Sequence, residues 1–310
     1  QLTHGLPLSG RWLPMVSSWA RARSLSAPVP SSSDVGQIAQ TDILTGGRLE
    51  CGVGRGHAWL QGPANVDMAE NQGRFTESLD ILLRAWTEDR FDYDGQFYHC
   101  DDLCVVPKPV QKPHPPVFVV GSSGRQFRRA AEQGFHVCVG GPVPSAVFFE
   151  PMQVYREACS EFGTRPYVGF IKAIYLHEDE AQAHAEAREA VQNFLRWNFS
   201  PIHSLDRESP EARQRLLDAG FGFYADAPFL PVLDWSYEQM VEEGVVFVGT
   251  PEQVAGQLVS LYGDAGGFEE LIIMSLYGGL TKQQAMRTQE LFAAQVMPVL
   301  RRACVPAAAA

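Results

Sequence analysis

The chain has 310 residues, of which 45% are hydrophobic, so it can bury the core of one barrel-sized domain or of two smaller domains. Its formal net charge is −11 and charges of both signs are interspersed, which argues against a surface that binds nucleic acid. The longest apolar runs have the length of a strand and fall far short of the roughly 20 residues that a membrane-spanning helix needs.

The beginning of the chain gives little regular pattern. It starts with Gln, and no basic stretch precedes an apolar one, so we expect an incomplete or processed start and not a signal peptide. Residues 1–33 are rich in Ser, Pro and Arg and are predicted to be irregular. Six cysteines without regular spacing favour reduced thiols and therefore a cytoplasmic protein.

The next segment predicts a helix from Asp34, which ends at Gly46 and Gly47 and is followed by a buried strand over 48–53. Between residues 68 and 88 the apolar positions recur at offsets of four, three and four, which predicts an amphipathic helix. They are Phe75, Leu79, Leu82 and Trp86.

Asp94 and Gly95 stand between aromatic residues, which predicts a hairpin with a two-residue turn and positive φ at both positions. The prolines of the following segment, 107–116, predict an extended connector, since proline lacks an amide proton and fixes φ.

The rest of the chain alternates strand-like and helical runs, which predicts parallel βα units and an α/β fold. The strand-like runs are 117–120, 135–139, 168–176 and 271–275, and the helical runs are 126–133, 148–162, 178–197, 251–262 and 282–300. A short strand, 245–248, precedes a helix that Thr250 and Gln253 begin as a capping box. Residues 199–235 break the alternation, and their aromatic residues favour a lid.

Glycines and an arginine follow the first predicted strand. Gly54 lets the backbone approach a ligand, and the guanidinium of Arg55 offers a fork of donors to a phosphate. A dinucleotide fingerprint would need Gly at the position of His57, and a P-loop would end in Gly-Lys-Ser/Thr. The alternative is that Arg55 pairs with a surface carboxylate. His57 is either a proton-transfer group or an ordinary loop histidine.

A second cluster, Gly121, Ser122, Ser123 and Gly124, connects a buried strand to the start of a helix. Its amides and hydroxyls therefore form a potential anion site. The alternative is that one serine hydroxyl only caps the helix. If the strands before both clusters are successive in one parallel barrel, both clusters lie at the same carboxyl-terminal rim and converge on one phosphate.

Metal binding is not expected. Cys100 and Cys104, with His99 and His114 nearby, have the wrong spacing and too few ligands for a structural zinc site. The acidic residues 178–180 are typical of a solvated helix start.

Residues 41–56, TDILTGGRLECGVGRG, resemble the D-x-L-S-x-G-R…G-x-G-R-G signature of the bacterial-luciferase-like family. The resemblance covers roughly residues 34–301, within an expected barrel domain of 34–303. Further short segments that are similar to sequence motifs of the family lie at 95–98, 107–116, 121–123, 130–134, 249–251 and 295–298.

The resemblance implies a (β/α)₈ barrel of the TIM type, usually a homodimer, that binds FMN or deazaflavin F420 and a small organic substrate. In the family, the arginine of the glycine cluster and the turn after the fifth strand bind the flavin phosphate. These roles carry over to Gly54 and Arg55 and to the turn of Gly121, Ser122, Ser123 and Gly124. A flavin reductase would supply the reduced FMN.

Family barrels begin with three strand-helix units, the second of which ends in a run with a catalytic histidine. About five barrel strands are recognisable here, so we expect an N-terminally incomplete barrel. The leading hypothesis is a monooxygenase that uses reduced FMN and O₂. The alternatives are a truncated, inactive flavin-binding member and an F420-dependent enzyme that transfers hydride.

Overall fold

A computed structural model of the chain describes residues 32–56, 67–199, 209–219 and 234–304. The chain divides into two compact units, Gln1–Val119 and Val120–Ala310. Residues 1–31, which were predicted to be irregular, lie outside the described residues. So does most of the predicted lid over 199–235, of which the helix α8 (Pro210–Asp218) is described. The lid stays a prediction.

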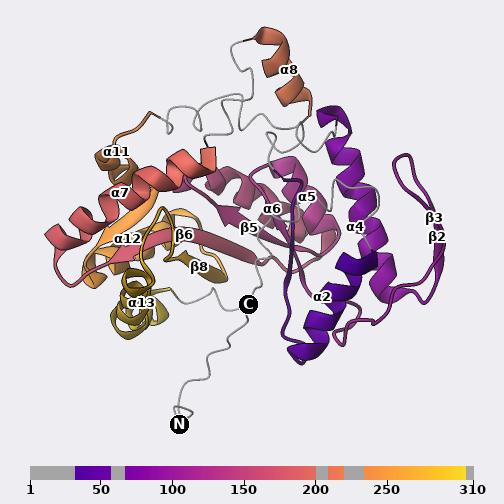
Figure 1. The fold of residues 1–310 in the computed structure, drawn as a ribbon, viewed down its shortest axis with the longest axis horizontal. Helices are drawn as coiled ribbons and strands as arrows, with labels where there is room; N and C mark the ends of the chain where they lie inside the picture. Colours follow the sequence, from indigo (N-terminus) through magenta and orange to yellow (C-terminus); the bar gives the residue numbers. More distant parts are fainter. Residues whose placement is uncertain (1–31, 57–66, 200–208, 220–233, 305–310) are drawn as a thin grey trace. The chain divides into compact units, whose positions relative to one another are not determined.

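The first unit combines helices, a parallel strand pair and a hairpin (Figure 1). Strand β1 pairs in parallel with β4, and Val53 lies opposite Val119. The elements are α2 (Ser32–Leu44), β1 (Cys51–Val53), the 3₁₀ turn η1 (Met68–Glu70), α4 (Asn71–Thr87), β2 (Phe91–Asp94), β3 (His99–Leu103) and most of β4 (Val117–Val120).

Helix α4 confirms the amphipathic pattern. It buries Phe75, Leu82 and Trp86, while Leu79 is only half-buried. The indole Nε1 of Trp86 donates a hydrogen bond to the carbonyl of Val35 on α2, at 3.2 Å. The apolar face of α4 therefore packs on α2, and this bond satisfies the one polar group of the buried indole.

The predicted two-residue hairpin turn is wrong. Asp94 pairs with His99, so the loop has four residues, and neither Asp94 nor Gly95 has a positive φ. The carboxylate of Glu77 on α4 accepts hydrogen bonds from the backbone N–H groups of the loop, at 2.8 Å from Gln96, 3.0 Å from Phe97 and 3.1 Å from Tyr98. The turn is therefore held by a contact between residues that are distant in the sequence. Local turn preferences cannot predict such a contact.

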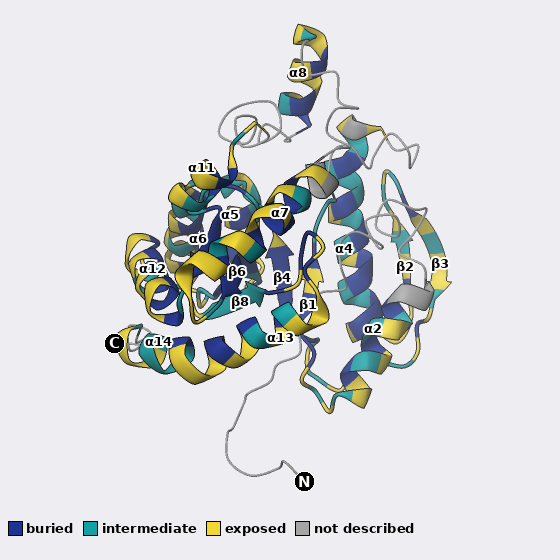
Figure 2. Ribbon diagram, turned by 60° about the vertical axis from the view of Figure 1, so that its left-hand side comes forward, coloured by how far each residue is buried: buried dark blue, intermediate teal, exposed yellow. Residues whose placement is uncertain are grey.

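In the second unit, the fully buried strand β6 (Val168–Leu176) is central. Its first half pairs with β5 (His136–Gly140), its second half with β7 (Val246–Gly249), and residues 169–173 pair with β8 (Glu270–Met274). All three pairings are parallel, as the strand-helix alternation predicts. Figure 2 shows β6 in the dark blue of buried residues.

The helices of the second unit confirm the predicted alternation, with one exception. The predicted helix over 282–300 is interrupted by a π-helical turn over 292–296, because Pro298 lacks the amide proton and crowds the preceding turn. The helices are α5 (Gly124–Glu132), α6 (Phe149–Phe162), α7 (Glu180–Phe199), α11 (Tyr237–Glu242), α12 (Pro251–Asp264), α13 (Lys282–Leu291) and α14 (Met297–Ala303).

Capping boxes begin three of these helices. Thr250 and Gln253 form the predicted box at α12. Equivalent pairs, Ser236 with Gln239 and Thr281 with Gln284, begin α11 and α13. Each pair satisfies two backbone donors of a helix start by contacts within four residues, so the sequence alone can report them.

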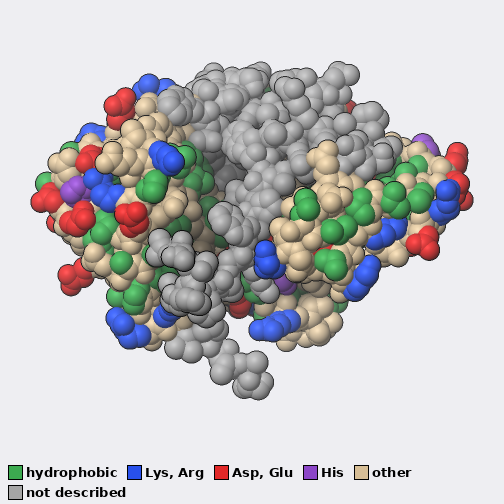
Figure 3. Space-filling view, turned by 60° about the horizontal axis from the view of Figure 1, so that its bottom comes forward, with side chains coloured by type: hydrophobic (Ala, Val, Ile, Leu, Met, Phe, Trp, Pro, Cys, Tyr) green, Lys and Arg blue, Asp and Glu red, His purple; other side chains and the backbone are tan. Residues whose placement is uncertain are grey.

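The surface carries both signs of charge. On the described part of the face in Figure 3, acidic and basic side chains are interspersed. None of the helices in the described ranges has the length and apolar composition that crossing a membrane requires.

Candidate functional site

Gly54 and Arg55 directly follow β1 in the first unit, and both are half-buried. The parallel register with β4 means that the chain leaves both strands at the same end of this pair. Gly56, the next residue, has a φ of 76°, a value that favours glycine. His57 lies outside the described residues, so its predicted role stays a prediction.

Asn71, the first residue of α4, supports the backbone of Arg55. Its side-chain amide Nδ2 donates a hydrogen bond to the carbonyl of Arg55, at 3.2 Å. Asn71 is only 4% exposed, and its Oδ1 has no hydrogen-bond partner among the described residues. Nothing in the sequence pattern marks this residue, because its contact joins residues 16 positions apart.

In the second unit, the turn from Gly121 to Gly124 connects β4 to α5. The N–H of Gly121 donates to the carbonyl of Cys138 on β5, at 3.2 Å. Ser123 is the N-cap residue, but its hydroxyl makes no capping hydrogen bond. The first bond of the helix runs from the N–H of Phe127 to the carbonyl of Ser123, so the amides of residues 124–126 need other acceptors.

Gln126 adds a further donor to this turn. A Cβ built on Gly121 would lie 2.5 Å from the Oε1 of Gln126, so the side chain of Gln126 packs where any larger residue would stand. The Nε2 of Gln126 is buried, and no described residue is its hydrogen-bond partner. A buried donor without an acceptor costs free energy that an anionic ligand can recover.

The turn therefore fits a phosphate group. It combines the start of a nine-residue helix, the hydroxyls of Ser122 and Ser123, and the unpaired amide of Gln126. Amide and hydroxyl donors at a helix start suit an anion, because the helix dipole places partial positive charge there. Sequence reasoning found the turn but missed Gln126.

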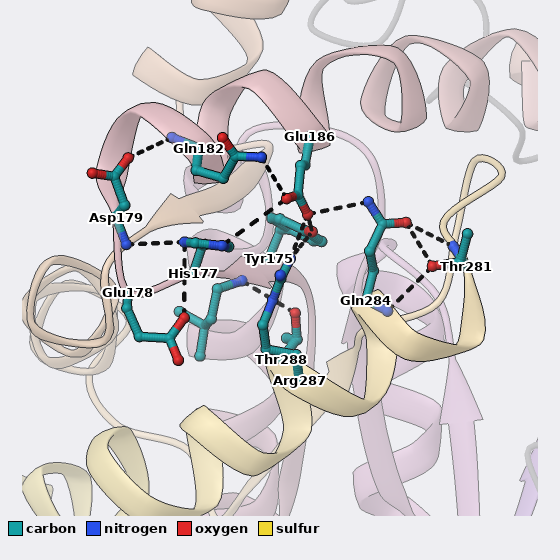
Figure 4. A network of polar contacts seen from close by, with 11 residues as sticks. Tyr175, His177, Glu178, Asp179, Gln182, Glu186, Thr281, Gln284, Arg287 and Thr288 are labelled. Atoms are coloured by element: carbon teal, nitrogen blue, oxygen red, sulfur yellow. Dashed lines mark hydrogen bonds and ion pairs between the residues drawn. The ribbon is translucent and has the colours of Figure 1, made fainter.

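A network of polar residues lies at the carboxyl end of β6, between α7 and α13 (Figure 4). The hydroxyl of Tyr175 donates to Glu186, and the guanidinium of Arg287 donates to both residues. Gln182 and Gln284 donate to the same carboxylate, at 2.8 Å and 3.2 Å. The carboxylate of Glu186 thus joins one strand and two helices.

The electrostatics of this network favour a charged Glu186. Burial alone would raise the pKa of Glu186, but the hydrogen bonds from Tyr175, Gln182 and Arg287 lower it to about 2. Burial, with the bond to Glu186, raises the pKa of Tyr175 to about 12. The carboxylate therefore stays ionised and the phenol protonated, which suits a structural role better than proton transfer.

His177 lies beside this network (Figure 4). Its Nδ1 accepts a hydrogen bond from the N–H of Asp179, at 3.0 Å. Its Nε2 lies 4.0 Å from Glu186. Both ring nitrogens therefore face protein groups.

Lys172, in the middle of β6, is 2% exposed. Its Nζ donates to the Oγ of Ser145, at 2.7 Å, and to the carbonyl of Gly244, and lies 4.5 Å from the ring centroid of Phe247. Burial lowers the pKa of Lys172 to about 7. In the sequence, this buried contact is indicated by a single lysine within the apolar run 168–176.

Metal ligands do not gather in the part of the chain that the structure describes. No three His, Cys, Asp or Glu side chains there could hold a metal ion together. Cys100 lies within the hairpin and is partly exposed, and Cys104 follows it and is exposed.

Parallel strands that alternate with helices define the class of this protein as an α/β fold of the TIM-barrel type. Within that class, the family model described as "Luciferase-like monooxygenase" matches residues 35–268. The chain belongs to this family, which confirms the resemblance seen in its sequence.

Two curated relatives differ in their cofactor. An FMNH(2)-dependent dimethylsulfone monooxygenase from Pseudomonas putida is 26% identical over 283 residues, which cover 86% of this chain and 69% of the relative. An F420-dependent glucose-6-phosphate dehydrogenase from Nakamurella multipartita is 26% identical over 196 residues, 59% of this chain and 56% of the relative.

Solved structures support the fold class. The monooxygenase RslO1 from Streptomyces bottropensis has a TM-score of 0.68 and 23% sequence identity, and the match covers 86% of this chain and 73% of that protein. The predicted α/β fold with parallel strands, as in luciferase-like TIM barrels, is confirmed.

Proposed function

We propose that this protein binds a flavin cofactor and acts as an oxidoreductase, specifically a monooxygenase that uses reduced FMN and O₂ on a small organic substrate. The observation that carries the proposal is the turn Gly121–Gly124, whose donors include the buried, unpaired amide of Gln126. Membership of the luciferase-like monooxygenase family supports it.

The residues that would hold the cofactor come from two strand ends. In the first unit, Gly54 and Arg55 offer a phosphate a backbone amide and a guanidinium. In the second unit, the turn of Gly121, Ser122, Ser123 and Gly124 offers amides and hydroxyls. When bound, the flavin supplies the redox chemistry, and this chain positions it and excludes water. His57 is the candidate proton-transfer group of this proposal, and its alternative role is that of an ordinary loop histidine.

F420 is the alternative cofactor, with hydride transfer in place of oxygen insertion. The F420-dependent relative supports this alternative. A phosphate-binding site cannot distinguish the two cofactors, since FMN and F420 both carry a phosphate on a ribityl chain. An inactive protein that only binds flavin is the third possibility. Because the proposed monooxygenase uses FMN in its reduced form, a separate flavin reductase would supply it. We also propose that the protein is a homodimer and is located in the cytoplasm.

The test is a titration of the purified chain with reduced and oxidised FMN and with F420, followed by absorbance. Arg55→Ala should weaken binding about 10- to 100-fold, because hydrogen bonds to a charged group each contribute about 1.5–3 kcal/mol. Gly121→Ala should weaken it too, since the new Cβ displaces Gln126.

Gly256→Ala is the matched control, because a Cβ at this position in α12 meets nothing within 4 Å. We expect this variant to bind like the wild type. If the wild type binds neither cofactor, the proposed function is wrong. If it binds one of them equally well after both Arg55→Ala and Gly121→Ala, the site is elsewhere.

A further inference from the structure

Asn71 carries a buried acceptor beside the predicted phosphate-binding arginine. Its Nδ2 donates to the carbonyl of Arg55, and only the nitrogen of a carboxamide can donate to a carbonyl, so the orientation of the amide is fixed. The Oδ1 at the other end of the same planar group is buried and has no hydrogen-bond partner in the part of the chain that the structure describes. Asn71 as a whole is 4% exposed.

Two donor side chains of the same helix, both within the described residues, are engaged elsewhere. The guanidinium of Arg74 is engaged with Glu70, with Nε at 2.9 Å and Nη2 at 2.7 Å from the carboxylate. The amide of Gln72 donates to the Oγ1 of Thr76, at 3.3 Å. Because a buried acceptor without a donor is unfavourable, the position is suited to a ligand that carries a donor.

The chemistry of the proposed cofactor narrows the choice of donor. A phosphate near neutral pH offers acceptors to Arg55, and few or no donors. The hydroxyl groups of the ribityl chain, next to the phosphate, are donors as well as acceptors. The flavin ring, with its own N–H group, lies a whole sugar chain away from the phosphate.

We propose that Asn71 binds the cofactor directly, with its Oδ1 accepting a hydrogen bond from a ribityl hydroxyl next to the phosphate that Arg55 holds. The inference rests on the proposed function. It assigns to Asn71 two tasks: its nitrogen positions the Arg55 backbone, and its oxygen selects a phosphorylated polyol over other anions. Both tasks apply equally to FMN and F420.

The test compares FMN with a phosphorylated flavin whose side chain is a plain alkyl chain without hydroxyls. The wild type should prefer FMN. Asn71→Ala removes both the support of the Arg55 backbone and the buried acceptor, so it should weaken binding of both flavins. FMN binding should be weakened about tenfold more than binding of the alkyl analogue, because only FMN also loses a hydrogen bond from its side chain. Gln72→Ala, which removes the adjacent carboxamide, should change neither affinity.

Asn71→Asp is the second variant, and it keeps an acceptor of the same shape while losing the donor to Arg55. It should bind both flavins more weakly but retain the preference for FMN. Circular dichroism of each variant reports whether it is folded, and the preference is a ratio measured on one and the same variant.

Three results would overturn the inference: equal losses for both flavins in Asn71→Ala, no loss for either, or a preference that disappears in Asn71→Asp. In each of them the wild type still binds FMN, so the proposed function stands. If the wild type binds no flavin at all, the proposed function itself is wrong.

Discussion

At the scale of single residues, the buried Lys172 predicts how the stability of the protein depends on pH. Its ordinary pKa is 10.5, and burial lowers this to about 7 in the folded chain. The unfolded chain therefore binds more protons than the folded chain between about pH 7 and pH 10.5. Stability should rise with pH across this window, because the charged form is disfavoured in the folded state.

Lys172→Met should remove this rise, since methionine fills a similar volume without a charge. We expect the variant to be as stable or more stable below pH 7, by roughly 1 kcal/mol, as for other buried charges replaced by apolar groups. Urea unfolding between pH 6 and pH 10 would measure the free energy of unfolding of both proteins as a function of pH. Lys282→Met, at an exposed position that begins α13, is the control and should keep the rise. An unchanged slope in Lys172→Met would contradict the assignment.

At the scale of elements, the hairpin β2–β3 depends on one side chain of a helix. The carboxylate of Glu77 accepts hydrogen bonds from three backbone N–H groups of the loop. Glu77→Gln replaces one of its oxygens by an amide nitrogen, which cannot accept these bonds. We expect a loss of about 1–3 kcal/mol, the cost of unsatisfied donors beside a lost charge. Hydrogen exchange of the Gln96, Phe97 and Tyr98 amides should accelerate.

The matched control for this helix-hairpin contact is Glu132→Gln at the exposed end of α5. It should leave hydrogen exchange at the hairpin unchanged. Protection of the three loop amides that survives Glu77→Gln would show that strand pairing alone holds the turn.

The elements also show what a sequence can report. The box of Thr250 and Gln253 was predictable because it joins residues three positions apart. The hairpin turn was predicted wrongly because its partner, Glu77, lies 19 to 21 positions away. Asn71 was missed for the same reason, since its partner Arg55 lies 16 positions away. Gln126 lies only five positions from Gly121, but no sequence motif reports that its side chain packs against this glycine.

At the scale of the molecule, strand-helix alternation was sufficient to predict parallel strands and the family's α/β fold, because each unit is a local pattern repeated along the chain. The helix-strand contacts that hold the second unit together were not predictable in this way. Tyr175, Glu186 and Arg287 come from three elements over 112 positions of sequence.

This network predicts how the protein responds to acid. The pKa of Glu186 is about 2 in the folded chain, against an ordinary value of 4.5. Its contribution to stability is therefore complete above about pH 4.5 and is lost as the pH falls towards 2, because the unfolded chain takes up the proton first. Glu186→Gln should flatten this acid limb and lower stability at pH 7 by roughly 1–3 kcal/mol, since Arg287 and Tyr175 lose a charged acceptor.

Glu189→Gln, three residues further along α7 and exposed, is the control and should change neither the acid limb nor the stability at pH 7. Guanidinium unfolding from pH 2.5 to pH 7 distinguishes the two variants, and an acid limb that persists in Glu186→Gln would assign the acid sensitivity to other carboxylates.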